Sequence, residues 1–304
     1  MRPRRTVTRI LTVCAGLATL SACIVYANTE LRLRRSYRVP ASELQVPADP
    51  EAIVRGQRLV HVVAQCTNCH GADLAGQLLG DDPWIGRLAA PNLTRGRGGV
   101  GSLSDERLVR SIRYGVGRDG RPLVMMPAQY LRNLSDGDLG AIIAYLRSLP
   151  PIDRELPPRR VGPLSRLAFF LGRVPDVVPA ETLADASPPP PAPEPAISVG
   201  YGRYLVDTAG CRVCHRQDLR GGLHPLAIPG EPPPPDLTGA GPLGTWSERD
   251  FVHTLRTGIT PEGRALDEAY MPWRRTGRMS DSELGAIWRY LRSLGPRRTD
   301  GARS

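Results

Sequence analysis

The chain has 304 residues, enough for about two domains of ordinary size. Its formal net charge is +10, and because it contains no lysine, all of its Lys/Arg-type basic residues are arginines. These arginines are dispersed and no nucleic-acid recognition motif accompanies them, so we expect a solvated basic surface and no nucleic-acid partner.

Residues 1–27 have the composition of an export signal or a membrane anchor. A cluster of arginines precedes an uncharged stretch from Ile10 to Ala27, and a basic flank before an apolar segment is typical of both. Two hypotheses stay open. We favour a spanning helix, because the apolar run is long enough to cross a bilayer. Alternatively, LSAC at 20–23 resembles the lipobox of bacterial lipoproteins, in which Cys23 would carry the lipid.

Both hypotheses place the rest of the chain on the periplasmic side of a bacterial cytoplasmic membrane. They also tie it to that membrane, either by an N-terminal helix or by a lipid. Residues 28–50 are predicted as an extended membrane-proximal stretch leading to the first folded domain.

Beyond residue 50 the chain contains two copies of one pattern, which we place at 51–149 and 197–295. Self-similarity of this kind indicates a duplicated domain. The matching segments are CTNCH (66–70) and CRVCH (211–215), APNLT (90–94) and PPDLT (234–238), and LSDGDLGAIIAYLRSL (134–149) and MSDSELGAIWRYLRSL (279–294). Each copy also holds a Met-Pro pair, and Met126 follows His70 at the same spacing as Met271 follows His215. The equal spacing suggests that both ends contact one shared object.

The Cys-x-x-Cys-His motif admits several chemistries. A structural zinc site takes four ligands, whereas each copy clusters three. A thioredoxin-like dithiol needs a βαβ unit, whereas these flanks look helical, and a disulfide explains neither the histidine nor the methionine. Covalent attachment of haem c explains them all, because two thiols add to the vinyl groups, the histidine faces the iron and a thioether completes the coordination. We predict two covalently bound haem c groups.

With these motifs the chain resembles the small class I c-type cytochromes, twice over. The N-terminal segment, APNLT and the closing segments also make it similar to the multihaem cytochrome c subunits of membrane-bound dehydrogenases. Those subunits typically carry three haem motifs, and this chain has two.

The resemblance implies a role for individual residues. In each copy two cysteines would form thioether bonds, the histidine and the methionine would bind iron, and a proline carbonyl would accept a hydrogen bond from the histidine. These residues are Cys66, Cys69, His70, Met126 and Pro91 in the first copy, and Cys211, Cys214, His215, Met271 and Pro235 in the second. Met125 competes with Met126, and we choose Met126 because it directly precedes a proline, as Met271 does.

The implied fold is all-α, with two tandem cytochrome c-like domains, each a few helices around a haem, after the N-terminal anchoring segment. A helix is expected to open and close each copy. Gly56 and Gly202 would let these helices cross closely against Tyr145 and Tyr290.

Several local features complete the prediction. Asp136 and Asp281 are expected to cap the closing helices. Residues 150–196 are predicted as a Pro-rich linker with a short helix in PLSRLAFFLGRVP, and residues 296–304 as a disordered tail. Arg216, which replaces the glycine that follows the first motif, is expected to be solvated.

A haem bound by both His and Met has no free position, which suits electron transfer better than catalysis. The chain is therefore expected to be an electron carrier with no catalytic residues of its own. It would pass electrons between a dehydrogenase or respiratory complex and an acceptor such as an oxidase or a soluble cytochrome. The alternative is a dihaem enzyme of the peroxidase or thiosulfate dehydrogenase type, in which one iron lacks methionine. His61, His224 and His253 have no counterparts in the other copy and are expected at the surface or in packing.

Overall fold

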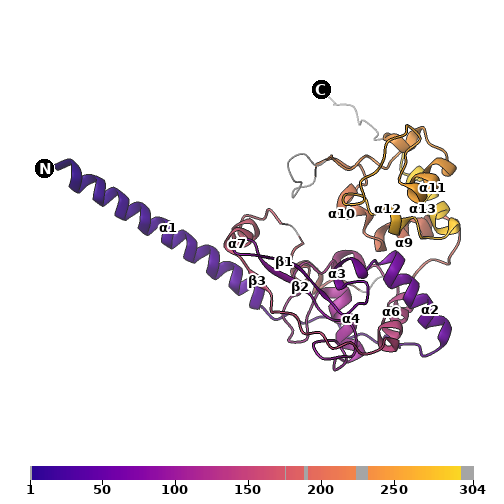
Figure 1. Cartoon of the computed structure of the whole chain (residues 1–304), viewed down its shortest axis with the longest axis horizontal. Coiled ribbons are helices and arrows are strands. Elements are labelled where there is room, and N and C mark those ends of the chain that lie inside the picture. The colour runs from indigo at the N-terminus through magenta and orange to yellow at the C-terminus, as the bar shows by residue number, and fades with distance from the viewer. Residues whose placement is uncertain (1, 175, 188–190, 224–231, 296–304) are drawn as a thin grey trace.

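Figure 1 shows a computed structural model of the chain, which describes residues 2–174, 176–187, 191–223 and 232–295. Helix α1, Arg2–Arg34, projects from a body made of two domains. Our prediction that residues 28–50 are extended was wrong for 28–34, which continue this helix. In the described ranges Thr6–Arg34 is the one segment that is long and apolar enough to cross a membrane, judged by length and composition. Its side chains from Val7 to Ile24 are exposed, so the rest of the described chain does not cover them.

Where the chain is described, the two domains contain the same series of five α-helices in the same order, and each adds one short helix of another type at a different place. Domain 1 holds α2 (Pro50–Arg58), η1 (Leu59–Val63), α3 (Thr67–His70), α4 (Asp105–Tyr114), α5 (Ala128–Leu131) and α6 (Asp136–Ser148). Domain 2 holds α9 (Val199–Thr208), α10 (Cys211–His215), η2 (Pro242–Gly244), α11 (Glu248–Thr257), α12 (Trp273–Thr276) and α13 (Asp281–Ser293). The predicted opening and closing helices of both copies are present. The predicted tail at 296–304 lies outside the described residues.

The first and last helices of each domain cross at a glycine. A Cβ atom on Gly56 would stand 2.8 Å from the Cβ atom of Tyr145, and closer still to the backbone carbonyl of Ala141. A Cβ atom on Gly202 would meet Tyr290 at the same 2.8 Å. Because only a residue without a side chain permits so close an approach of two helices, the predicted crossings are confirmed.

Both closing helices are capped by the serine of their Ser-Asp pair. Ser135 and Ser280 each accept a hydrogen bond from a backbone N–H three residues further on. Our prediction that Asp136 and Asp281 are the caps was wrong. Both aspartates lie in the first turn instead, where a negative charge still favours the positive end of the helix.

A small antiparallel sheet adds to the helices of domain 1. Its strands lie in the order β1 (Gln77–Asp82), β2 (Gly86–Ala90) and β3 (Arg160–Val161). We did not predict these strands, because β1 reads QLLGDD and β2 reads GRLAA, neither of which alternates apolar and polar residues.

The first part of the predicted linker lies along domain 1. The carbonyl of Ile152 accepts a hydrogen bond of 2.7 Å from Asn92, and Arg154 forms an ion pair of 2.9 Å with Asp73. Residues 152–159 have no regular secondary structure, and these contacts and strand β3 attach them to the domain.

The predicted short helix of the linker is α7, Pro163–Phe170, and it packs against the last turns of α1. Leu33 of α1 is buried with Phe169 and Val178. A second short helix, α8 (Ala180–Leu183), follows. The linker therefore holds the C-terminal end of α1 against domain 1.

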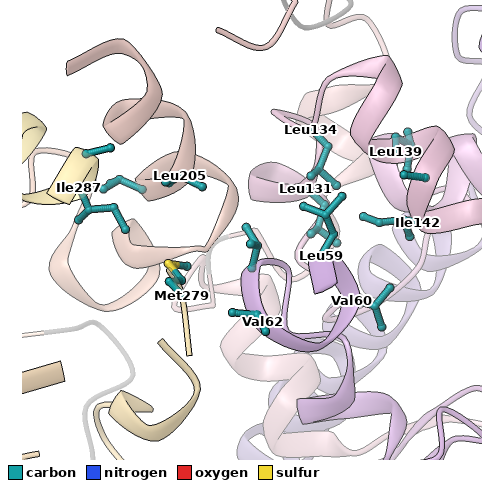
Figure 2. Packing of buried hydrophobic residues seen from close by; sticks show 14 of the residues in the cluster. Leu59, Val60, Val62, Leu131, Leu134, Leu139, Ile142, Leu205, Met279 and Ile287 are labelled. Carbon is teal, nitrogen blue, oxygen red and sulfur yellow. The ribbon is translucent and has the colours of Figure 1, made fainter. Parts of the chain in front are cut away.

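The two domains share one hydrophobic cluster. Figure 2 shows members from domain 1, including Leu59 and Val62, together with Leu205 and Met279 of domain 2. Short helix α5 contacts α9, and α12 contacts η1. Each domain thus places the helix that follows its Met-Pro pair against the opening helical segment of the other.

Polar contacts between the domains repeat at equivalent positions. Arg58, two residues after the crossing glycine of domain 1, pairs with Glu283 of α13. Tyr204, two residues after the crossing glycine of domain 2, donates a hydrogen bond to Asp138 of α6. Asp138 and Glu283 occupy matching positions and are 2% and 7% exposed, so both acceptors are shielded from water. The domains therefore face each other with an approximate two-fold relation.

Candidate haem-binding sites

Each Cys-x-x-Cys-His motif forms a short helical turn directly after the opening helix of its domain. The first cysteine of each motif packs against the hydrophobic cluster. Burial raises the pKa of the Cys66 thiol to about 12 and that of Cys211 to about 11. The second cysteines, Cys69 and Cys214, are exposed, and no disulfide joins the cysteines in the part of the chain that the structure describes.

The two histidines are held in matching orientations. The Nδ1 atom of His70 lies 2.8 Å from the carbonyl oxygen of Pro91, and that of His215 lies 2.9 Å from the carbonyl oxygen of Pro235. A carbonyl can only accept, so Nδ1 carries the proton and the lone pair remains on Nε2. Both rings are 6% exposed, and this burial lowers the pKa of each histidine despite the hydrogen bond to the carbonyl. Each imidazole is therefore neutral and able to bind a metal through Nε2.

The loop after each histidine positions the proline carbonyl. Leu74 and Leu219 adopt positive φ angles of 57° and 60°, and both are fully buried. The carbonyl of Leu74 accepts a hydrogen bond of 2.8 Å from the N–H of Leu93, and that of Leu219 accepts one of 2.8 Å from Leu237. These bonds fix the segment two residues after the proline and so bring its carbonyl to the histidine.

The residue after each histidine shares one backbone conformation despite a change of residue type. Gly71 has φ 80° and ψ 159°, and Arg216 has φ 65° and ψ 166°. This region is populated almost only by glycine and costs other residues about 1–3 kcal/mol. Arg216 is exposed, as predicted, and its backbone is strained.

The methionines differ in burial. Met126 and Met271 are partly buried and pack against the hydrophobic cluster. Met125 is 56% exposed and has a positive φ of 64°, so its backbone turns the side chain away from the core. The geometry favours Met126 over Met125 as the thioether of domain 1.

The donor set suits haem better than a bare metal ion. Among the described residues no group of three or more His, Cys, Asp or Glu side chains is placed to hold a metal ion. Each site instead offers one buried imidazole nitrogen, one thioether at the edge of an apolar core and two thiols on one helical turn. Such a set matches an iron that brings its own four equatorial ligands, with the thiols left for covalent attachment.

The second cysteine of each motif interacts electrostatically with a side chain of the other domain, which the sequence alone did not reveal. Burial raises the pKa of the Cys69 thiol, and the positive charge of Arg275 in domain 2 partly opposes this shift. In domain 1 burial raises the pKa of Tyr130, and the negative charge of Asp176 raises it further. Cys214 of domain 2 has the same effect in its thiolate form. Tyr130 and Arg275 stand at the same distance along the chain from Met126 and Met271, so each motif meets the equivalent side chain of the partner domain.

Two of the remaining histidines have no place in these sites. The Nε2 atom of His61 lies 3.0 Å from the Tyr145 hydroxyl, within the helix packing of domain 1. His253 is exposed on α11. His224 lies outside the described residues.

Comparison with known protein families identifies the two copies. The family described as cytochrome c oxidase, cbb3-type, subunit III matches residues 51–146, and the cytochrome c family matches residues 199–295. The chain contains two cytochrome c domains. The resemblance seen in the sequence and the mostly helical architecture predicted from it are confirmed.

Curated relatives show the wider similarity of this two-domain cytochrome. It is 27% identical over 301 residues to the fructose dehydrogenase cytochrome subunit of Gluconobacter japonicus, covering 90% of this chain and 58% of that one. It is 28% identical over 282 residues to the gluconate 2-dehydrogenase cytochrome c subunit of Pantoea cypripedii, covering 82% and 60%. The cytochrome c subunit of the quinone-dependent alcohol dehydrogenase of Gluconacetobacter polyoxogenes is 27% identical over 283 residues, covering 83% and 58%. The chain is thus homologous to cytochrome c subunits of membrane-bound dehydrogenases, but spans less than two thirds of the length of these relatives.

Proposed function

We propose that this chain is a membrane-tethered dihaem cytochrome c that carries electrons on the periplasmic side of a bacterial cytoplasmic membrane. The observation that carries this proposal is the repetition of one complete donor set in both domains. Each domain presents a buried neutral histidine, a partly buried methionine and a Cys-x-x-Cys turn. A carrier needs two closed sites, whereas a dihaem peroxidase or thiosulfate dehydrogenase needs one open position.

Each residue of the set has a distinct task in this proposal. A bound haem c supplies a reversible one-electron couple. In each domain the two motif cysteines would attach one haem, and His70 or His215 would bind its iron through Nε2 while the proline carbonyl holds the ring orientation. Met126 and Met271 would supply the second protein ligand. The apolar core around each set excludes water, which limits the reorganisation that accompanies a change of charge.

The interface between the domains supports electron exchange within the chain. Helix α5 of domain 1 contacts α9 of domain 2, and α12 of domain 2 contacts η1 of domain 1, so the segment that leads into each motif lies against the other domain. The buried contacts Arg58–Glu283 and Tyr204–Asp138 hold the domains together at two equivalent points. An electron that enters one domain can therefore be passed to the other without diffusion between separate proteins.

The electron donor in this proposal is a membrane-bound dehydrogenase, and the acceptor is a downstream oxidase or soluble cytochrome. The names of the relatives, which are cytochrome subunits of fructose, gluconate and alcohol dehydrogenases, support a dehydrogenase as the donor. The alternative, an independent dihaem enzyme, needs one iron without methionine, whereas both domains offer a methionine.

Mass spectrometry of the denatured chain tests the cofactor, and two covalent haem additions are expected. Optical spectra of the reduced and oxidised chain should show two low-spin six-coordinate haems, and peroxide or thiosulfate should give negligible turnover. A single haem addition would contradict the dihaem carrier. Sustained turnover on the order of 10 per second with either substrate would favour the dihaem enzyme instead.

A further inference from the structure

A cavity of about 770 Å³ lies where the last turns of α1 meet domain 1. Tyr26, Glu30 and Leu33 line it from α1, and their spacing of three to four residues places them on one face of the helix. The loop around Arg118 and the segment from Arg159 to Arg166 form its other walls. The site is separate from both haem-binding sets, none of whose residues lines it.

The helix is fixed at this level by several contacts. Arg166 donates a hydrogen bond of 2.8 Å to the Thr29 hydroxyl and pairs with Glu30 at 2.6 Å. Its guanidinium also lies 4.2 Å from the centroid of the Tyr26 ring. These contacts hold the last turns of α1 in place and so fix the shape of the cavity between α1 and domain 1.

The walls of the cavity carry an excess of positive charge. Six arginines line it, against two carboxylates, Glu30 and Asp119. Four of these arginines are paired with those carboxylates or with Asp81. The other two, Arg118 and Arg159, have no carboxylate within 4.0 Å in the described ranges of the chain.

Arg118 and Arg159 both have exposed side chains. The Arg159 guanidinium donates one hydrogen bond of 3.1 Å to the carbonyl of Pro122. Arginine stays charged in proteins, so its remaining N–H groups can donate to an anion. Guanidinium groups bind phosphate oxygens in a fork with two parallel hydrogen bonds.

The cavity also lies at the level where α1 would leave a membrane. The apolar run of α1 ends at Ala27, next to Tyr26 in the cavity wall, and tyrosine is typical of the membrane–water boundary. A lipid on Cys23 would place the membrane surface at nearly the same point. Both anchoring hypotheses would therefore place the cavity near the phosphate groups of the outer leaflet.

We propose that this cavity binds the phosphate of an acidic phospholipid, with Arg118 and Arg159 as its main contacts and the acyl chains alongside α1. The proposal rests on the membrane tether of the proposed function. Free inorganic phosphate offers the same oxyanion, and the experiment separates the two sources. Binding of the headgroup offsets one of these two positive charges and holds domain 1 at a fixed height above the membrane.

The test uses the full chain with both haems, in nanodiscs of phosphatidylcholine with or without phosphatidylglycerol. Native mass spectrometry after transfer to detergent counts the retained phosphatidylglycerol. The R118Q/R159Q double variant should retain at least about tenfold less, which corresponds to a loss of about 1.4 kcal/mol or more in binding free energy. R107Q removes the same charge from an exposed position outside the cavity and should retain as much as the unaltered chain.

A single variant and a competition with inorganic phosphate complete the test. Because Arg159 also bonds the Pro122 carbonyl, R118Q alone, whose side chain is exposed, should lose part of the retention without loss of stability. Equal retention by R118Q/R159Q and R107Q would overturn the proposal, as would displacement of the lipid by millimolar inorganic phosphate. If the unaltered chain carries two haems but retains no lipid, the lipid site alone is refuted. If it retains lipid but carries no haem, the proposed function alone is refuted.

Discussion

The helix crossing in domain 2 can be tested by adding one methyl group at Gly202. Alanine gains about 0.8–1.0 kcal/mol over glycine in a helix interior, so propensity alone predicts stabilisation. The new Cβ atom would, however, stand 2.8 Å from that of Tyr290, against about 3.5–4.0 Å for an ordinary carbon contact. The closer obstacle is the backbone carbonyl oxygen of Ala286 at 1.9 Å, which cannot rotate away, so α9 and α13 must move apart by more than about 1 Å.

Overpacking of this kind costs about 1–3 kcal/mol, occasionally more. Because the clash is with a backbone carbonyl, we expect the upper end of this cost for G202A. After the gain in propensity is subtracted, about 2 kcal/mol of stability should be lost, which lowers the Tm of a domain of about 100 residues by roughly 8–16 °C. Thermal unfolding of the haem-loaded chain, followed by far-UV circular dichroism, measures this shift. Because α9 leads into the haem-binding turn α10, the visible spectrum of domain 2 should change as well.

Gly200 provides a matched control in the same helix. The nearest atom to a Cβ atom there is 3.9 Å away, on Pro193, so G200A adds the methyl group without a clash. This variant should be as stable as the unaltered chain or slightly more stable. If G202A unfolds at the same temperature as G200A, the close crossing does not limit the packing of domain 2 and the reasoning fails.

Four further predictions concern single side chains. M126A should remove thioether ligation at one haem and lower its reduction potential, because thioether sulfur favours Fe(II). M125A should leave the redox titration unchanged, and the opposite pair of results would show that the neighbouring methionine is the ligand. R216G should stabilise domain 2 by about 1 kcal/mol in urea unfolding, since the strain of about 1–3 kcal/mol exceeds the entropy that glycine adds. A less stable variant would contradict that assignment of strain. E283Q keeps an acceptor for the helix cap but removes the charge that faces domain 1. In urea the free energy of unfolding should fall by about 1 kcal/mol, and the unfolding curve should separate into two transitions. A single transition at an unchanged urea concentration would show that this contact does not hold the domains together. For C23A, unchanged membrane association without loss of a lipid label supports the spanning helix, whereas an uncleaved precursor without lipid supports the lipoprotein.

Much of each domain could be predicted because the duplicated segments carry local signals. The Ser-Asp pairs precede apolar rows and mark where the closing helices begin, and the crossing glycines recur at matching positions. The serine and the aspartate could not be told apart as the cap from sequence, because both residue types cap helices well. The structure decides for serine, whose hydroxyl accepts the backbone hydrogen bond.

The contacts between domains could not be predicted, because no local pattern marks them. Arg58 and Tyr204 differ in chemistry although they occupy equivalent positions, so a comparison of the copies does not single them out. Their shared role depends on which helices of the two domains meet, and that is a tertiary property. The same holds for strand β3, a two-residue strand that forms only because the linker lies along β2.

A difference of one residue between the copies shows how a local change in the sequence affects the contact between the domains. The first copy has one more residue than the second between its crossing glycine, Gly56, and its first motif cysteine. The structure absorbs the extra residue in η1, where the N–H of Ala64 bonds the carbonyl of Leu59, five residues earlier, at 2.8 Å. A π-turn of this kind widens the helix locally without shifting what lies before or after it. The crossing glycine and the haem-binding turn therefore keep equivalent places in both domains, while the widened turn lies against α12 of domain 2. The insertion thus alters the surface that meets the other domain and leaves the haem-binding geometry unchanged, as the matching histidine–proline distances of 2.8 and 2.9 Å require.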